Sequence, residues 1–171
     1  MNTNFDEQTT RTVNDLIETC RGGMKGYETA AGKVENPELK SEFSRLSQQR
    51  AVFINELEST ARQYGLTAQN EDTLEEVAMD AASAVHRGWM NLKSALTGNT
   101  SEAILSECEN GDAAALKTYE QALAVQTLPP DLIDVIEKQH QQILEAKNHI
   151  TSLKQTIWFF ILQFKFSVCL P

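Results

Sequence analysis

Long runs of apolar residues at helical spacing constrain this chain more than any other feature. From about Asp6 to Val34 apolar side chains recur every three or four residues, and the same spacing governs four later stretches. Only 8 Gly and 4 Pro occur among 171 residues, and long stretches lack both. The sequence therefore predicts an all-α fold in one domain, long enough to bury a core.

Signals for helix ends separate five predicted helices. These helices cover about residues 6–34, 37–64, 74–97, 101–126 and 130–153. Asn36 is placed to cap the second helix, with Pro37 at its first position, and Gly65 is placed to end it in the left-handed conformation. The remaining end signals are the capping box Thr73–Glu76, Gly98-Asn99 and Pro129-Pro130.

The lengths of the connections predict a topology. Short connections at Asn36-Pro37 and Pro129-Pro130 make two antiparallel helical hairpins. The segment Leu74–Thr97 is long enough to return along the bundle, which would leave the second and fourth helical segments parallel. This is a ferritin-like four-helix bundle whose long crossover contains an additional helix. The alternative is a five-helix up-and-down bundle. The domain is expected to cover residues 1–156.

Charge and cysteine content exclude several classes of function. The chain carries a formal charge of −9, which repels phosphate backbones, so nucleic acid is not an expected partner. The N-terminal residues contain no basic segment followed by an apolar run, so no signal peptide is indicated. Cys20, Cys108 and Cys169 form no Cys-x-x-Cys pair, which favours a reducing cytoplasm.

Three apolar stripes are interrupted near mid-helix by a large polar residue. Arg50 falls between Leu46 and Phe53, Asp112 in the stripe of the fourth segment, and His140 in that of the last. These positions predict a buried or half-buried structural layer of Arg50, Asp112 and His140, which Glu137 and Tyr27 could join. In the alternative, Arg50 extends to the surface and His140 borders an ordinary core. Glycines near the same level would leave room for the larger side chains: Gly22, Gly23, Gly26 and Gly111.

Four stretches of the chain resemble an uncharacterised bacterial family of ferritin-like four-helix bundles, a family of domains of unknown function. The stretches are Leu16–Ala31, Gln49–Phe53, His86–Leu96 (which includes the unusual string His-Arg-Gly-Trp-Met) and Ile104–Asp112. The similarity extends over roughly residues 10–155. It implies the fold, and it brings no settled activity with it.

The sequence contains only part of a di-iron site. Such bundles use one Glu from each of two helices and a Glu-x-x-His from each of the other two. Glu137 and His140 form one such motif, but the second helix has Ser47-Gln-Gln-Arg50 instead. Glu28, with Glu107 or Glu109, could supply single carboxylates. No cofactor is therefore expected.

These observations favour a non-enzymatic, cytoplasmic protein. The resemblance and the acidic charge suggest a scaffold with a housekeeping or stress-related role. The alternative is a metal-binding or di-iron oxidase bundle that holds iron with Glu28, Glu109, Glu137 and His140. The expected partners are further copies of the chain, in a homo-oligomer.

The C-terminal tail, residues 157–171, differs from the rest of the chain. It holds four of the 7 Phe and no acidic residue. Fifteen residues that include Gln163 and Lys165 are too few and too polar to span a membrane. Alternation of apolar residues predicts an extended, strand-like or interfacial segment outside the domain, rather than more helix. Three interpretations are open: a non-native extension of the reading frame, an anchor to a membrane surface or a partner, or a flap over the core.

Overall fold

The described helices form a four-membered bundle. The structure is a computed structural model that describes residues 7–66 and 100–167. Its elements are α1 (Glu7–Lys33), α2 (Pro37–Gln63), α4 (Ser101–Leu123) and α5 (Pro130–Ser167), and all regular structure in these two ranges is helical. The predicted all-α class is confirmed. The predicted helix Leu74–Thr97 lies outside the described residues, as does Cys169.

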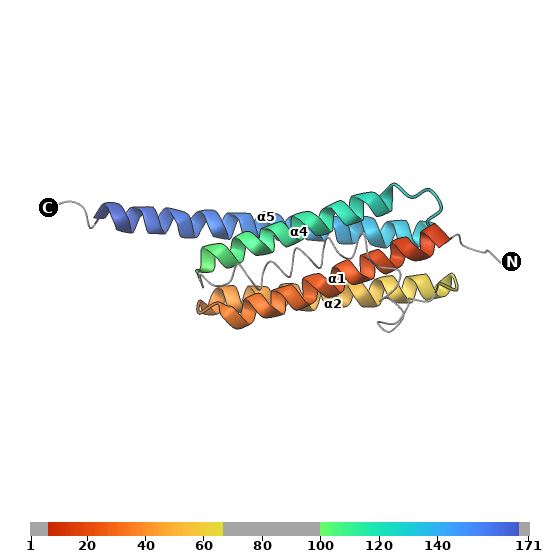
Figure 1. The fold of residues 1–171 in the computed structure, drawn as a ribbon, viewed down its shortest axis with the longest axis horizontal. Coiled ribbons are helices and arrows are strands. Elements are labelled where there is room, and N and C mark those ends of the chain that lie inside the picture. Colours follow the sequence, from red (N-terminus) through yellow and green to blue (C-terminus); the bar gives the residue numbers. More distant parts are fainter. Residues whose placement is uncertain (1–6, 67–99, 168–171) are drawn as a thin grey trace.

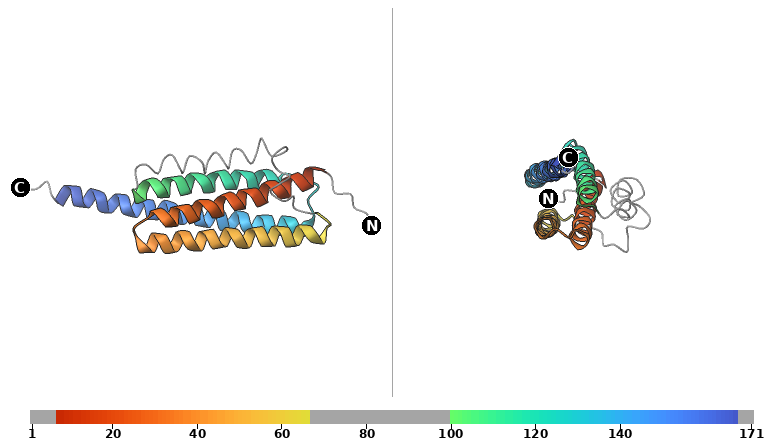
Figure 2. Two further views of the ribbon diagram at one scale, coloured as in Figure 1. Left: turned by 60° about the horizontal axis from the view of Figure 1, so that its bottom comes forward. Right: turned by 90° about the vertical axis from the view of Figure 1, so that its left-hand side faces the viewer.

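The four helices form two antiparallel hairpins that pack side by side (Figure 1). Helix α1 contacts α2 and α4, and α5 contacts α4 and α2. The pairs α1 with α5 and α2 with α4 therefore lie across the diagonals, which the views in Figure 2 support. Helices α2 and α4 run in the same direction, because α2 ends at the end of the bundle opposite to that where α4 begins.

Local chemistry fixes both ends of α2 as the sequence predicts. The Asn36 side chain accepts hydrogen bonds from the backbone N–H groups of Glu38 at 2.9 Å and Leu39 at 3.1 Å. At the other end Gly65 has φ +74°, a conformation that disfavours any residue with a Cβ. The Leu66 N–H then reaches the carbonyl of Ala61 at 3.1 Å and closes a Schellman motif.

The buried positions of each helix alternate in steps of three and four residues, the spacing of a heptad seam. In α2 the buried residues of this seam are Leu39, Phe43, Leu46, Arg50, Phe53, Leu57 and Thr60. In α1 they are Val13, Leu16, Cys20, Gly23, Tyr27 and Ala30. In α4 they are Leu105, Cys108, Asp112, Ala115, Tyr119 and Ala122. The polar residues Arg50 and Asp112 thus occupy core positions.

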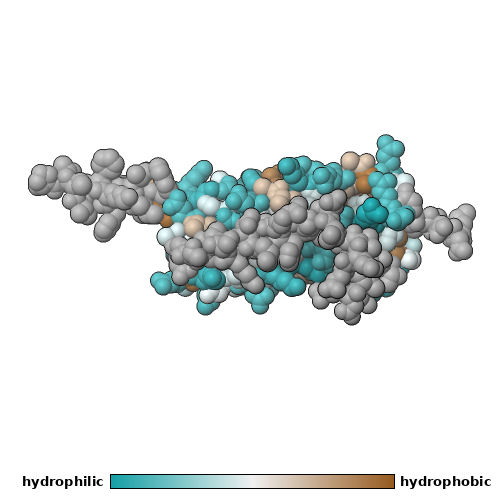
Figure 3. All heavy atoms as spheres, in the orientation of Figure 1, coloured by the Kyte–Doolittle hydropathy of each residue, from teal (hydrophilic) through white to brown (hydrophobic). Residues whose placement is uncertain are grey.

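The surface is largely hydrophilic where it is described on the face shown in Figure 3. No helix within the described residues is long and apolar enough to cross a membrane.

The C-terminal segment does not have the predicted extended conformation. Helix α5 continues without a break to Ser167, so the prediction for residues 157–167 is wrong. The alternation of Phe160, Leu162, Phe164 and Phe166 suggested a strand, but the segment continues a helix already formed by residues 130–156. Extending a helix costs far less than nucleating one, and this advantage outweighs local β-propensity.

Candidate functional site: a buried polar cluster

A cluster of three polar side chains lies at the centre of the bundle, and we call Tyr27, Arg50 and Asp112 the central cluster. Arg50 Nη2 donates to Asp112 Oδ1 at 2.9 Å, and both side chains are only 2% exposed. The Tyr27 hydroxyl donates to the other carboxylate oxygen, Oδ2, at 2.6 Å. Each oxygen of the Asp112 carboxylate therefore has its own donor, which a buried charge requires.

Arg50 has further partners besides Asp112. Nη1 donates to Gln49 Oε1 at 2.8 Å. The guanidinium carbon lies 5.3 Å from the centre of the Phe53 ring and 5.7 Å from that of Tyr27. At these distances both rings attract the cation through their quadrupoles. Arg50 is therefore held in the core and does not extend to the surface.

Burial and mutual contact fix the charge states in the central cluster. Burial favours the neutral form of Arg50, but the adjacent Asp112 carboxylate and Tyr27 outweigh this effect, so the pKa of Arg50 is raised. Burial, together with the Asp112 charge, raises the pKa of Tyr27 well above its usual range. Tyr27 therefore remains a proton donor and Arg50 remains a cation at any physiological pH.

A second buried chain of hydrogen bonds runs beside the central cluster. The Tyr119 hydroxyl donates to Gln139 Oε1 at 2.7 Å, and it lies 3.0 Å from Cys20 Sγ. Because the hydroxyl proton is engaged with Gln139, the thiol is left to donate to the Tyr119 oxygen. Gln139 Nε2 donates to the Phe53 carbonyl at 3.2 Å and to Glu56 Oε2 at 3.0 Å. This series of hydrogen bonds links all four described helices.

The two buried cysteines are inert thiols. Cys20 and Cys108 are both free and buried. Burial raises the pKa of Cys20 to about 11, and burial together with the nearby Asp112 charge raises that of Cys108 further. A thiol with such a pKa is protonated at neutral pH and is a poor nucleophile.

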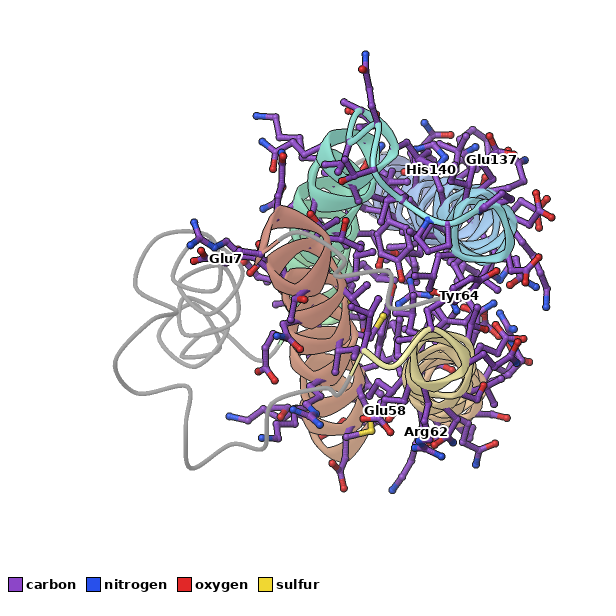
Figure 4. The ribbon with its side chains drawn as sticks, turned by 90° about the vertical axis from the view of Figure 1, so that its right-hand side faces the viewer. Glu7, Glu58, Arg62, Tyr64, Glu137 and His140 are labelled. Atoms are coloured by element: carbon purple, nitrogen blue, oxygen red, sulfur yellow. The ribbon has the colours of Figure 1, made fainter. Side chains whose placement is uncertain are left out.

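His140 lies apart from the central cluster. Its side chain is 25% exposed, and its Nε2 atom is 3.8 Å from Glu120 Oε1, beyond hydrogen-bond distance. Figure 4 shows His140 and Glu137 on α5, and Glu137 is exposed. The structure thus brings together Arg50 and Asp112 of the predicted layer, and it places His140 against α4 near the surface.

The remaining metal-ligand candidates are separate from one another. Glu28 is exposed on α1. The Glu109 carboxylate accepts hydrogen bonds from Lys154 Nζ and, at 2.7 Å, from Thr151 Oγ1. These two contacts lower the pKa of Glu109 and engage both of its oxygens. Within residues 7–66 and 100–167 no three His, Cys, Asp or Glu side chains form a group that could hold a metal ion.

Gln139 is the buried polar residue of α5 that sequence reasoning missed. The Gln139 side chain is 0% exposed. The available signal is the heptad seam, since steps of four and three residues from Leu132 lead through Ile136 to position 139 and then to Ile143. The predicted layer has His140 in this place, and His140 lies one residue further on and about 100° around the helix from Gln139.

Gly23 lies beside Arg50, but there is enough room at this position for the Cβ atom of an alanine. A Cβ at this position would lie 3.4 Å from Arg50 Cγ and 3.5 Å from its Cδ and Nε, all ordinary contact distances. Gly23→Ala is therefore expected to raise the free energy of unfolding by about 0.5–1 kcal/mol, because alanine favours a helix interior. Urea denaturation followed by circular dichroism measures the change.

Gly32→Ala is the matched control for that substitution, since a Cβ there would meet nothing within 4 Å. Both variants should gain stability. A loss for Gly23→Ala beside a gain for Gly32→Ala would show that Arg50 needs the empty space.

No curated protein matches the chain. The family model described as a domain of unknown function, DUF2383, matches residues 8–125, which include Tyr27, Arg50 and Asp112 but not α5. The match covers more than half of the 171 residues. The chain therefore belongs to the DUF2383 family.

Proposed function

We propose that the protein is a bacterial, cytoplasmic bundle of the ferritin-like type that acts as a non-enzymatic scaffold, in a housekeeping or stress-related role. One observation carries this proposal: the Arg50–Asp112 ion pair fills the centre of the bundle, where a di-iron bundle places its metal ligands. The free, buried thiols of Cys20 and Cys108 fit a reducing compartment.

The arrangement of the helices supports the ferritin-like assignment. Two antiparallel hairpins with α2 parallel to α4 are what one long connection between hairpins produces. Residues 67–99 form that connection in the sequence.

A guanidinium in the core opposes a metal centre electrostatically. Arg50 holds a permanent positive charge 2.9 Å from the carboxylate that a metal ion would need, and Asp112 is already neutralised by it. Within the two buried clusters, the Asp112 carboxylate and the Gln139 amide are hydrogen-bonded to neighbouring side chains. Arg50, Asp112 and Gln139 are buried, so they are not accessible to a substrate.

Metal loading tests the proposal. After incubation with Fe(II) without oxygen, followed by desalting, elemental analysis should find far less than one iron per chain. Addition of oxygen to a fresh Fe(II) mixture should give no oxidation faster than that of buffer. His140→Ala is the matched control and should leave both results unchanged. Two iron atoms per chain, lost together in His140→Ala, would refute the proposal.

A further inference from the structure

The heptad seam of α5 continues beyond the bundle. Its core residues follow strict steps of four and three: Leu132, Ile136, Gln139, Ile143, Ala146, Ile150, Leu153 and Ile157. The same steps lead next to Phe160 and Phe164, which are both large and apolar. Residues 157–167, which we call the α5 extension, therefore repeat the pattern that the earlier part of α5 uses to pack against other helices.

The other three helices do not accompany the α5 extension. Helix α5 has 38 residues, whereas α2 has 27 and α4 has 23. Figures 1 and 2 show its C-terminal part projecting alone past the ends of α1, α2 and α4. Ile157 still packs against the core, and Phe159, which lies outside the seam, is 60% exposed. Among the described helices, α5 therefore extends beyond the helices that pack against its seam.

The apolar side chains of the α5 extension are unfavourable in water unless another surface packs against them. The extension spans about 16 Å as a helix, too short to cross a membrane. Only Gln163, Lys165 and Ser167 among its residues are polar. A seam of large apolar side chains at heptad spacing is the surface that a second helix covers.

The net charge of the chain limits which partner can pack against the extension and in which orientation. The whole chain carries −9 and residues 155–171 carry only Lys165, so the remaining residues carry −10. This charge opposes binding to an anionic membrane and also opposes two bundles side by side. If two extensions pack antiparallel, the bundles lie at opposite ends, about 16 Å apart. That separation is about two Debye lengths at physiological salt.

We propose that two copies of the chain associate through their α5 extensions, packed antiparallel with Phe160 and Phe164 at the centre of the contact. The arrangement has two-fold symmetry, because the same seam serves both copies. Each extension is free of acidic residues, so the contact itself adds no repulsion between carboxylates. The inference concerns a surface outside the bundle interior, and it holds whether or not the interior binds metal.

Light scattering coupled to gel filtration of the full chain tests this proposal over a series of protein concentrations. The contact is small for a stable interface, so the mass should rise with concentration towards twice the 19.1 kDa of one chain. Phe164→Glu should abolish this rise, because it puts a charge into the seam. Gln163→Glu adds the same charge one residue away, beside the seam and not in its core positions, and should retain the dimer.

Phe160→Glu provides a second seam variant, and circular dichroism verifies that each variant keeps its helices. Three results would overturn the proposal. The full chain could remain at 19.1 kDa at every concentration. The glutamate variants at positions 163 and 164 could dissociate equally. The chain could also co-sediment as a monomer with vesicles of phosphatidylcholine and phosphatidylserine, which would identify a membrane as the cover.

Discussion

Replacing Arg50 by alanine is expected to lower the free energy of unfolding by about 3–5 kcal/mol. The substitution removes the cation that neutralises Asp112, whose side chain is only 2% exposed. The carboxylate must then remain charged without a cationic partner or take up a proton inside the core. Chemical denaturation monitored by circular dichroism measures the loss.

Arg45→Ala is the control for this effect. Arg45 belongs to the same helix and pairs with Glu42 at 2.6 Å, but its side chain is 56% exposed. Exposed pairs contribute about 0–1 kcal/mol, so this variant should change little. Equal, small losses in the two variants would show that the Arg50–Asp112 pair does not stabilise the core.

Replacing Gln139 by alanine is expected to cost about 2–4 kcal/mol. The truncation leaves the buried Tyr119 hydroxyl without its acceptor and the Phe53 carbonyl without one donor. It also opens a cavity at a position that is 0% exposed. The same denaturation experiment measures this loss.

His140→Ala tests whether Gln139, and not its neighbour His140, is the buried polar residue of α5 in the bundle centre. His140 is partly exposed and forms only a distant contact with Glu120, so its truncation should cost less than about 1 kcal/mol. If His140→Ala is the more damaging of the two substitutions, the assignment of the buried layer of α5 to Gln139 is incorrect.

The helices themselves could be predicted because their signals are local. Asn36 and Gly65 act through backbone geometry within a few residues, and both ends of α2 lie where these residues place them. The all-α class follows from the same periodicity. The tail shows where local reasoning fails, since residues 157–167 follow the helix that precedes them rather than their own β-propensity.

The buried cluster was only partly predictable. Arg50 and Asp112 are conspicuous, because a charge within an apolar stripe has few explanations. Tyr119 and Gln139 carry no such signal, since tyrosine is common in cores and an uncharged amide resembles a surface residue. Their roles follow from the contacts of one with the other, which join residues 20 positions apart on two helices.

The Arg50–Asp112 pair also has a mechanical consequence. Within the described residues α2 and α4 have no close backbone contact, since they occupy diagonal corners of the bundle. Contacts between neighbouring helices alone do not fix the distance across a diagonal, so the bundle could shear from a square to a rhombic cross-section with all of these contacts kept. The pair links residues 62 positions apart across that diagonal and acts as a brace. Arginine is long enough to reach across, which explains why a costly cation occupies the middle of α2.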